Sequence, residues 1–281
     1  MRWPLPEDWP LRAQSRRVAL GSVDWHIQEL GEGDTLLLLH GAGGATQSWR
    51  AVAPILAKRY HVVAVDLPGQ GASYARWGTR FGLDDMAKAI TMLMRKKGWL
   101  PIAVVGHSAG GAIALRLAEM GVPGKTIGLN AALGKFGGIA GVLFPLTAQL
   151  LATNALAARL VSAQVGNERA VSRMLAGTGS TIDARGVELY TRLAGDPDHV
   201  HGTLRMMAHW QLDGLIARFA RNPARATLVV GTADAMVPPV TSASAVERLQ
   251  EAELVELEGL GHLAHEEAGE RVAEVIAKVL R

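Results

Sequence analysis

Apolar runs alternate with amphipathic segments along most of the chain. The runs LLLLH, HVVAVD and IAVVG end at His40, Asp66 and Gly106, and such short, mostly apolar runs predict parallel strands that are buried on both faces. The segments WRAVAPILAKR and LDDMAKAITMLMRKKG repeat apolar residues at spacings of three and four, with charged residues opposite, which predicts helices. Strand and helix therefore alternate, as they do in a doubly wound, mostly parallel α/β sheet.

The same alternation returns near the C-terminus after a long interruption. Residues 126–132 and 226–234 are strand-like, and the latter are followed by a helical pattern, the strand-like run AELVELEG and a closing helix. The interval between these two strands contains long helical patterns and is too long for a simple crossover, so we interpret it as a helical lid inserted after a strand. The predicted division is an α/β core of residues 1–132 and 223–281 and a lid of residues 133–222.

The lid begins with a stretch that could also suggest a membrane span. Residues 136–158 carry no formal charge, but Pro145, Gln149 and Asn154 interrupt the apolar character that a spanning helix requires. The stretch therefore favours a lid helix over a transmembrane helix. Shallow contact with a membrane surface stays open as an alternative.

Composition narrows the classes of function. Lysine and arginine total 29 against 26 acidic residues, a net charge of +3 without a dense basic stripe, so a nucleic-acid partner is not expected. The chain contains no cysteine, which excludes disulfides, thiolate metal sites and a cysteine nucleophile and suits a reducing compartment. The N-terminal MRWPLPEDWP lacks the apolar core of a signal peptide, and we expect a cytoplasmic protein, with membrane association as the open alternative.

The first candidate catalytic residue is a serine that lies between glycines. In GHSAGG, residues 106–111, Ser108 lies where a predicted strand ends and a predicted helix begins. Gly106 and Gly110 match the pattern G-x-S-x-G, in which a sharp turn raises the serine hydroxyl above the sheet. The alternative is that Ser108 only caps a helix. His107 is expected to be a packing residue.

A catalytic serine needs a base and an acid that orients the base, and both occur later in the chain. Asp234 follows a predicted strand, and His262 lies in GLGHLAHEE after the last predicted strand. The alternative acid position, after the preceding strand, holds Asn130, which carries no charge. His265 is a competing base, but we expect it to face solvent or to cap Glu266 and Glu267.

Stabilisation of the oxyanion requires two well-placed donors. HGAGG, residues 40–44, follows the first strong strand and can turn backbone N–H groups inward. We assign the amides of Ala42 and Ala109 to this role. Residues expected to contact substrate from the lid are Phe136, Phe144, Met207 and Trp210, and DLPGQGAS is expected to shape the wall of the site.

With these motifs in order, the chain resembles the α/β-hydrolase superfamily. At closer range it is similar to one family within it, the magnesium-chelatase accessory proteins of bacteriochlorophyll synthesis (BchO). The segments carrying this resemblance include HGAGGATQSWR, GLNAALGKFGGIAGVLFP, LAGTGSTIDARGVELYTRL and HVHGTLRMMAHWQLDGL, and they extend from about Trp3 to the C-terminus. The resemblance implies a tetrapyrrole context in a photosynthetic bacterium, magnesium chelatase as a partner, and Ser108, Asp234 and His262 as the hydrolase-like residues.

Three hypotheses of function follow. The first is a serine hydrolase that cleaves an ester of a bulky apolar compound such as a tetrapyrrole, without a metal or organic cofactor. The second is a non-catalytic accessory module that binds a porphyrin or docks on magnesium chelatase, in which His199, His201 or His209 could ligate a metal. The third is a general esterase or lipase without a role in pigment synthesis.

Overall fold

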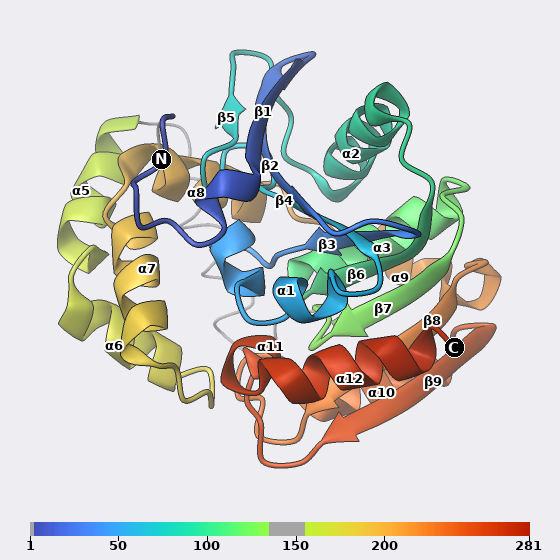
Figure 1. The fold of residues 1–281 in the computed structure, drawn as a ribbon. Coiled ribbons are helices and arrows are strands. Elements are labelled where there is room, and N and C mark those ends of the chain that lie inside the picture. The colour runs from blue at the N-terminus through green and yellow to red at the C-terminus, as the bar shows by residue number, and fades with distance from the viewer. Residues whose placement is uncertain (1–2, 135–154) are drawn as a thin grey trace.

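A mostly parallel sheet forms the centre of the molecule (Figure 1). The computed structural model describes residues 3–134 and 155–281, and in these ranges nine strands form one sheet in the order β1-β2-β4-β3-β6-β7-β8-β9, with β5 paired to β2. Strands β3, β4, β6, β7, β8 and β9 run parallel, whereas β1, β2 and β5 join antiparallel. The predicted fold class is confirmed. The strands are β1 Ser15–Leu20, β2 Val23–Leu30, β3 Thr35–Leu39, β4 His61–Val65, β5 Tyr74–Ala75, β6 Pro101–His107, β7 Lys125–Leu129, β8 Arg225–Gly231 and β9 Glu251–Leu257.

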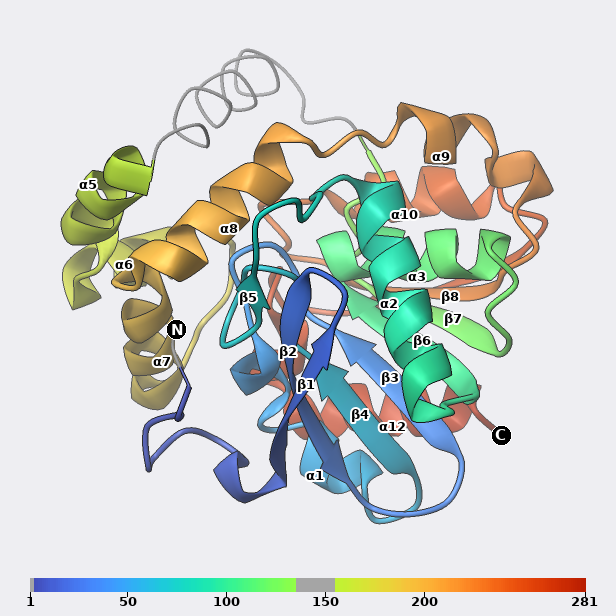
Figure 2. The same cartoon turned by 90° about the horizontal axis from the view of Figure 1, so that it is seen from above.

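Helices cover both faces of the sheet (Figure 2). On one face lie α2, α3 and α10, and on the other lie α1 and α12. The four leucines of β3 are buried on both faces of the sheet. Leu37 and Leu39 pack in the apolar cluster that includes α2 and α3, and Leu36 and Leu38 pack in the cluster that includes α1 and α12. The helices of the core are α1 Ala53–Leu56, α2 Leu83–Lys97, α3 Ala109–Glu119, α10 Pro239–Val246, α11 Ala264–Glu267 and α12 Gly269–Val279.

Two local features differ from the sequence pattern. The helix expected over residues 49–59 contains only α1, preceded by the 3₁₀ helix η2 (Thr46–Trp49), because the ring of Pro54 fits only the first turn of an α-helix. The hairpin β1–β2 was not predicted. Its signal is two strand-like runs separated by Gly21 and Ser22, and the φ of 58° at Gly21 suits a two-residue hairpin turn.

Between β7 and β8 every regular element among the described residues is a helix. We call this part of the chain, residues 155–222, the insertion. Helices α5, α6 and α7 lie to one side of the sheet (Figure 1), and α8 runs diagonally from this group toward the middle of the molecule (Figure 2). In the described ranges, no helix combines the length and apolarity needed to cross a bilayer. The helices of the insertion are α5 Ala155–Val165, α6 Glu168–Ala176, α7 Ala184–Ala194, α8 Pro197–Ala208, α9 Asp213–Ala217 and the 3₁₀ helix η3 Phe219–Arg221.

One close approach of the insertion to the core occurs at Gly202 of α8. A Cβ atom there would overlap the carbonyl oxygen of Gly69 in the loop after β4. Helix α8 therefore rests directly on the backbone of that loop, and only glycine allows this distance.

We expect Gly202→Ala to lower the free energy of unfolding by about 1–3 kcal/mol, the usual cost of overpacking. Gly214→Ala is the matched control, because a Cβ on this exposed glycine of α9 meets only the flexible tip of Arg218 at 3.2 Å. Denaturant unfolding of both variants measures the difference. Equal stability of the two variants would contradict the close contact.

Candidate active site

Ser108 occupies the sharp turn between β6 and α3. Its φ of 51° and ψ of −116° are a conformation that residues other than glycine rarely adopt. Its neighbours make the turn possible, because a Cβ on Gly106 would overlap the backbone of Gly110, and a Cβ on Gly110 would overlap the carbonyl oxygen of Leu39. The helix therefore sits against the strands at backbone distance, and the serine is held at the carboxyl edge of the sheet.

His262 and Asp234 form a buried hydrogen-bonded pair. Nδ1 of His262 donates to Oδ2 of Asp234 at 2.8 Å. The other carboxylate oxygen accepts the backbone N–H groups of Met236 and Val237, both at 2.8 Å, and Asn130 donates from Nδ2 to Oδ2 at 2.6 Å. Four donors thus fix the carboxylate, and with it the orientation of the imidazole. Asn130, at the alternative position for the acid, thus acts as a hydrogen-bond donor to Asp234.

The second contact of a Ser–His–Asp triad, the one between the serine and the histidine, is not formed between the described residues Ser108 and His262. Among the described residues, the half-buried hydroxyl of Ser108 and Nε2 of His262 have no hydrogen bond to each other. The two loops are nevertheless joined beside these side chains, because Nε2 of His107 donates to the carbonyl oxygen of His262 at 2.9 Å. The rings of His107 and His262 lie 4.8 Å apart. In enzymes without substrate, catalytic hydrogen bonds are often long and shorten when substrate binds.

The backbone next to Ser108 includes two candidate donors, the N–H groups of Ala42 and Ala109. Gly41 lies beside the serine, since a Cβ on Gly41 would be 2.9 Å from the Cβ of Ser108. Within residues 3–134 and 155–281, the N–H groups of Ala42 and Ala109 have no acceptor. The loop that carries Ala42 is held by a hydrogen bond of 2.8 Å from the Gly43 N–H to the side chain of Gln70. These donors are thus available to an oxyanion at Ser108.

A histidine of the insertion also holds this loop, which the sequence did not reveal. Nδ1 of His199 accepts the N–H of Gly71 at 2.9 Å, and its Nε2 donates to the carbonyl oxygen of Gly43 at 3.1 Å. Burial lowers the pKa of His199 to about 3, which keeps the ring neutral, with one donor and one acceptor. Because both nitrogens bind backbone groups, His199 is not free to ligate a metal.

The described residues contain no cluster of side chains arranged as a metal centre. No group of three or more His, Asp or Glu side chains in these ranges is arranged to hold a metal ion. Nδ1 of His209, another candidate ligand, donates to the carbonyl oxygen of Arg205 at 2.8 Å, and His201 also has a polar contact.

The expectation that His265 faces solvent or caps the final helix is wrong. Helix α11 packs on η2, which buries His265 completely and places its Nε2 2.8 Å from the hydroxyl of Ser48. The same hydroxyl donates to the buried Glu266, and so does Tyr190 at 2.7 Å. This second serine–histidine pair is sealed inside the protein, so substrate cannot reach it.

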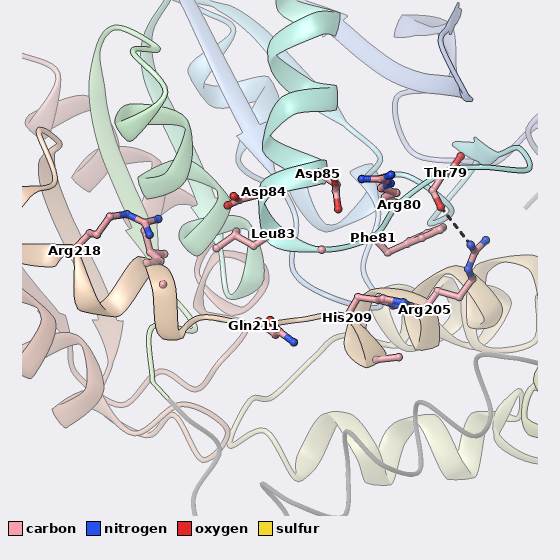
Figure 3. Close-up of a pocket in the computed structure, with 14 residues that line it drawn as sticks. Thr79, Arg80, Phe81, Leu83, Asp84, Asp85, Arg205, His209, Gln211 and Arg218 are labelled. Atoms are coloured by element: carbon pink, nitrogen blue, oxygen red, sulfur yellow. Dashed lines mark hydrogen bonds between the residues drawn. The ribbon is translucent and has the colours of Figure 1, made fainter.

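Of the four residues predicted to contact substrate, the structure describes Met207 and Trp210. Phe136 and Phe144 lie outside the described residues. Met207 and Trp210 are half-buried, and Trp210 packs against the apolar cluster of α2 and α3. Neither residue lines the cavity of about 860 Å³ between the start of α2 and the end of α8 (Figure 3), which extends from Arg218 to Arg205 and includes none of the candidate catalytic residues.

A serine on a strand-to-helix turn, beside a His–Asp pair at the carboxyl edge of a parallel sheet, defines the class of α/β hydrolases. The chain belongs to the alpha/beta hydrolase family, whose model matches residues 36–275. Over 275 residues it is 42% identical to the "Magnesium-chelatase 30 kDa subunit" of Rhodobacter capsulatus, a match that covers 97% of this chain and 96% of that protein. The resemblance inferred from the sequence motifs is thereby confirmed.

More distant similarities agree with this assignment. A Pseudomonas putida protein, the "Dihydrolipoyllysine-residue acetyltransferase component of acetoin cleaving system", is 30% identical over 260 residues, which cover 89% of this chain and 65% of that protein. The crystal structure of an alpha/beta hydrolase fold protein from Burkholderia ambifaria superposes with a TM-score of 0.77 at 22% identity, covering 94% of this chain and 97% of that one. The latter similarity concerns the fold alone.

The buried histidines predict how stability responds to acid. Burial lowers the pKa of His265 to about 3, whereas an unfolded chain binds this proton near pH 6.5. Between these values the unfolded state holds one more proton, so stability is full above pH 6.5 and falls as the pH decreases. We expect His265→Asn to reduce the loss of unfolding free energy between pH 6 and pH 5 by about 1 kcal/mol. Urea unfolding at both pH values measures this, and an unchanged pH dependence would contradict the neutral state.

Proposed function

We propose that this protein is a serine hydrolase that cleaves an ester of a bulky apolar substrate, with Ser108, His262 and Asp234 as its catalytic triad. The observation that carries the proposal is the 2.8 Å hydrogen bond from Nδ1 of His262 to Asp234. This bond fixes the tautomer in which Nε2 lacks a proton and can act as a base. Packing alone does not require a buried His–Asp pair next to a serine in a strained turn.

The geometry supports a reaction in two steps, acylation of Ser108 and then hydrolysis of the acyl-enzyme. Nε2 of His262 takes the proton of Ser108 as Oγ attacks the ester carbonyl carbon, and Asp234 stabilises the imidazolium. The N–H groups of Ala42 and Ala109 donate to the oxyanion. The alcohol leaves with the proton from His262, and water, activated by the same nitrogen, then releases the acid and restores the serine.

The proposed biological setting is bacteriochlorophyll synthesis. It is supported by similarity along nearly the whole chain to a protein named a magnesium-chelatase subunit. The proposed substrate class is therefore an ester of a tetrapyrrole, with Met207 and Trp210 as contacts from the insertion and magnesium chelatase as a partner. The reaction itself requires no cofactor.

A second candidate function is that of an accessory module that binds a tetrapyrrole or docks on magnesium chelatase without catalysis. The name of the Rhodobacter capsulatus relative, a subunit, favours it. In that case Ser108 has no chemical task. The reactivity of the Ser108 hydroxyl therefore separates the two functions.

We expect a fluorophosphonate probe to modify Ser108 rapidly and at one equivalent per chain, because His262 activates this hydroxyl. Ser108→Ala should abolish labelling, and Ser172→Ala, which changes an exposed serine of the insertion, should preserve it. Peptide mapping by mass spectrometry identifies the site and should find the buried Ser48 unmodified. A folded protein with an unreactive Ser108 that binds porphyrin tightly would support the accessory module instead.

We expect Asp234→Asn to reduce kcat by about 10⁴-fold with little change in KM, because the asparagine stabilises the wrong tautomer of His262. Asp84→Asn, which alters an exposed ion pair with Arg116, is the control. Nitrophenyl esters serve for kinetics, and chromatography after incubation with protoporphyrin esters, chlorophyllides and esterified pigments tests the substrate class. Equal kcat in both variants would remove Asp234 from the mechanism.

A further inference from the structure

A turn of the insertion lies between the loop of the acid and the loop of the base. This turn, residues 177–181, connects α6 to α7. The carbonyl oxygen of Thr178 accepts the N–H of Ala235 and the N–H of His262, both at 3.2 Å. This one carbonyl oxygen of the insertion therefore binds both the residue after Asp234 and the backbone of His262.

Ser180 adds a second connection to the loop of the base. Its hydroxyl oxygen accepts the N–H of Leu263 at 2.8 Å, and the side chain is buried. Glu267 strengthens the same junction, because one carboxylate oxygen accepts the N–H of Thr181 at 3.0 Å and the other accepts the N–H of Gly261 at 2.8 Å. The residues on both sides of His262 are thus hydrogen-bonded at this junction.

Steric contact shows how closely the turn fits. Gly179 has a φ of 80°, and a Cβ there would overlap the carbonyl oxygen of Ala233. A Cβ on Gly261 would in turn overlap the backbone of Gly179. Backbone therefore packs on backbone between the loop of Asp234 and the loop of His262.

We propose that Ser180 is a positioning residue for His262, through which the insertion holds the base against Asp234. The inference rests on the proposed function, since it assigns a role to Ser180 in the reaction of that site. Its hydrogen bond to Leu263 fixes the loop so that Nδ1 of His262 meets Asp234. A displacement of α6 or α7 then changes the His262–Asp234 pair, which makes these helices part of the catalytic apparatus rather than a separate cover.

Ser180→Ala and Ser180→Thr test this role, with Ser162→Ala as a matched control. Ser162 is also a buried serine of the insertion, but its hydroxyl bonds within its own helix, to the carbonyl oxygen of Arg159 at 3.0 Å. We expect Ser180→Ala to lower kcat for a nitrophenyl ester at least tenfold with little change in KM. Ser180→Thr, which keeps the acceptor, should recover most of the rate, and Ser162→Ala should match the wild type.

A spectroscopic measurement makes the test independent of activity. In protein labelled with ¹⁵N-histidine, the low-field ¹H resonance of the His262 Nδ1 proton reports the hydrogen bond to Asp234. We expect Ser180→Ala to weaken or shift this resonance and Ser162→Ala to leave it unchanged. If the wild type hydrolyses no ester, the proposed hydrolase function fails, but this resonance still shows whether Ser180 positions His262. The two proposals can therefore be rejected independently of each other. Folded Ser180→Ala with wild-type resonance and wild-type kcat would overturn the inference.

Discussion

The strained backbone at Ser108, with its positive φ, is the constraint on which the arrangement of the site depends. A side chain in this conformation costs about 1–3 kcal/mol, and it persists because β6 and α3 are buried on either side of it. Gly106 and Gly110 permit the strand and helix to approach at backbone distance. As a result the first N–H of α3, that of Ala109, has no acceptor within the described chain. The same turn thus presents both a hydroxyl and a donor at the edge of the sheet.

Neutral, buried histidines are the connectors around this turn. His40 donates from Nδ1 to Gly41 and accepts a backbone N–H at Nε2, and His199 bridges two loops in the same manner. Burial lowers the pKa of His40, His107 and His265. A neutral imidazole has one donor and one acceptor on opposite sides, so it can join two backbone segments without a buried charge. These rings therefore connect backbone segments, which differs from the catalytic role proposed for His262.

The insertion supports the site from two directions. Helix α8 supplies His199, which holds the loop carrying Ala42, and the turn between α6 and α7 supplies Thr178 and Ser180, which hold the loop carrying His262. The strands alone bring these loops to one edge of the sheet. Their mutual spacing is then set by hydrogen bonds from the insertion, whose geometry allows little variation. The sheet and the inserted helices are in this sense one structural unit around the site.

The sequence alone determined the α/β class, the positions of the buried parallel strands along the chain and the family, because each leaves a local pattern: apolar runs for strands buried on both faces, and glycines around Ser108 for a close turn. The order of the strands within the sheet was decided by the tertiary structure. Only the tertiary structure decided the burial of His265, the contact of Asn130 with the acid and the junction at Ser180. These features join segments that are tens to hundreds of residues apart in the chain. A hydrogen bond between distant segments leaves no periodicity or spacing in the sequence, so it exists only once packing has brought its donor and acceptor together.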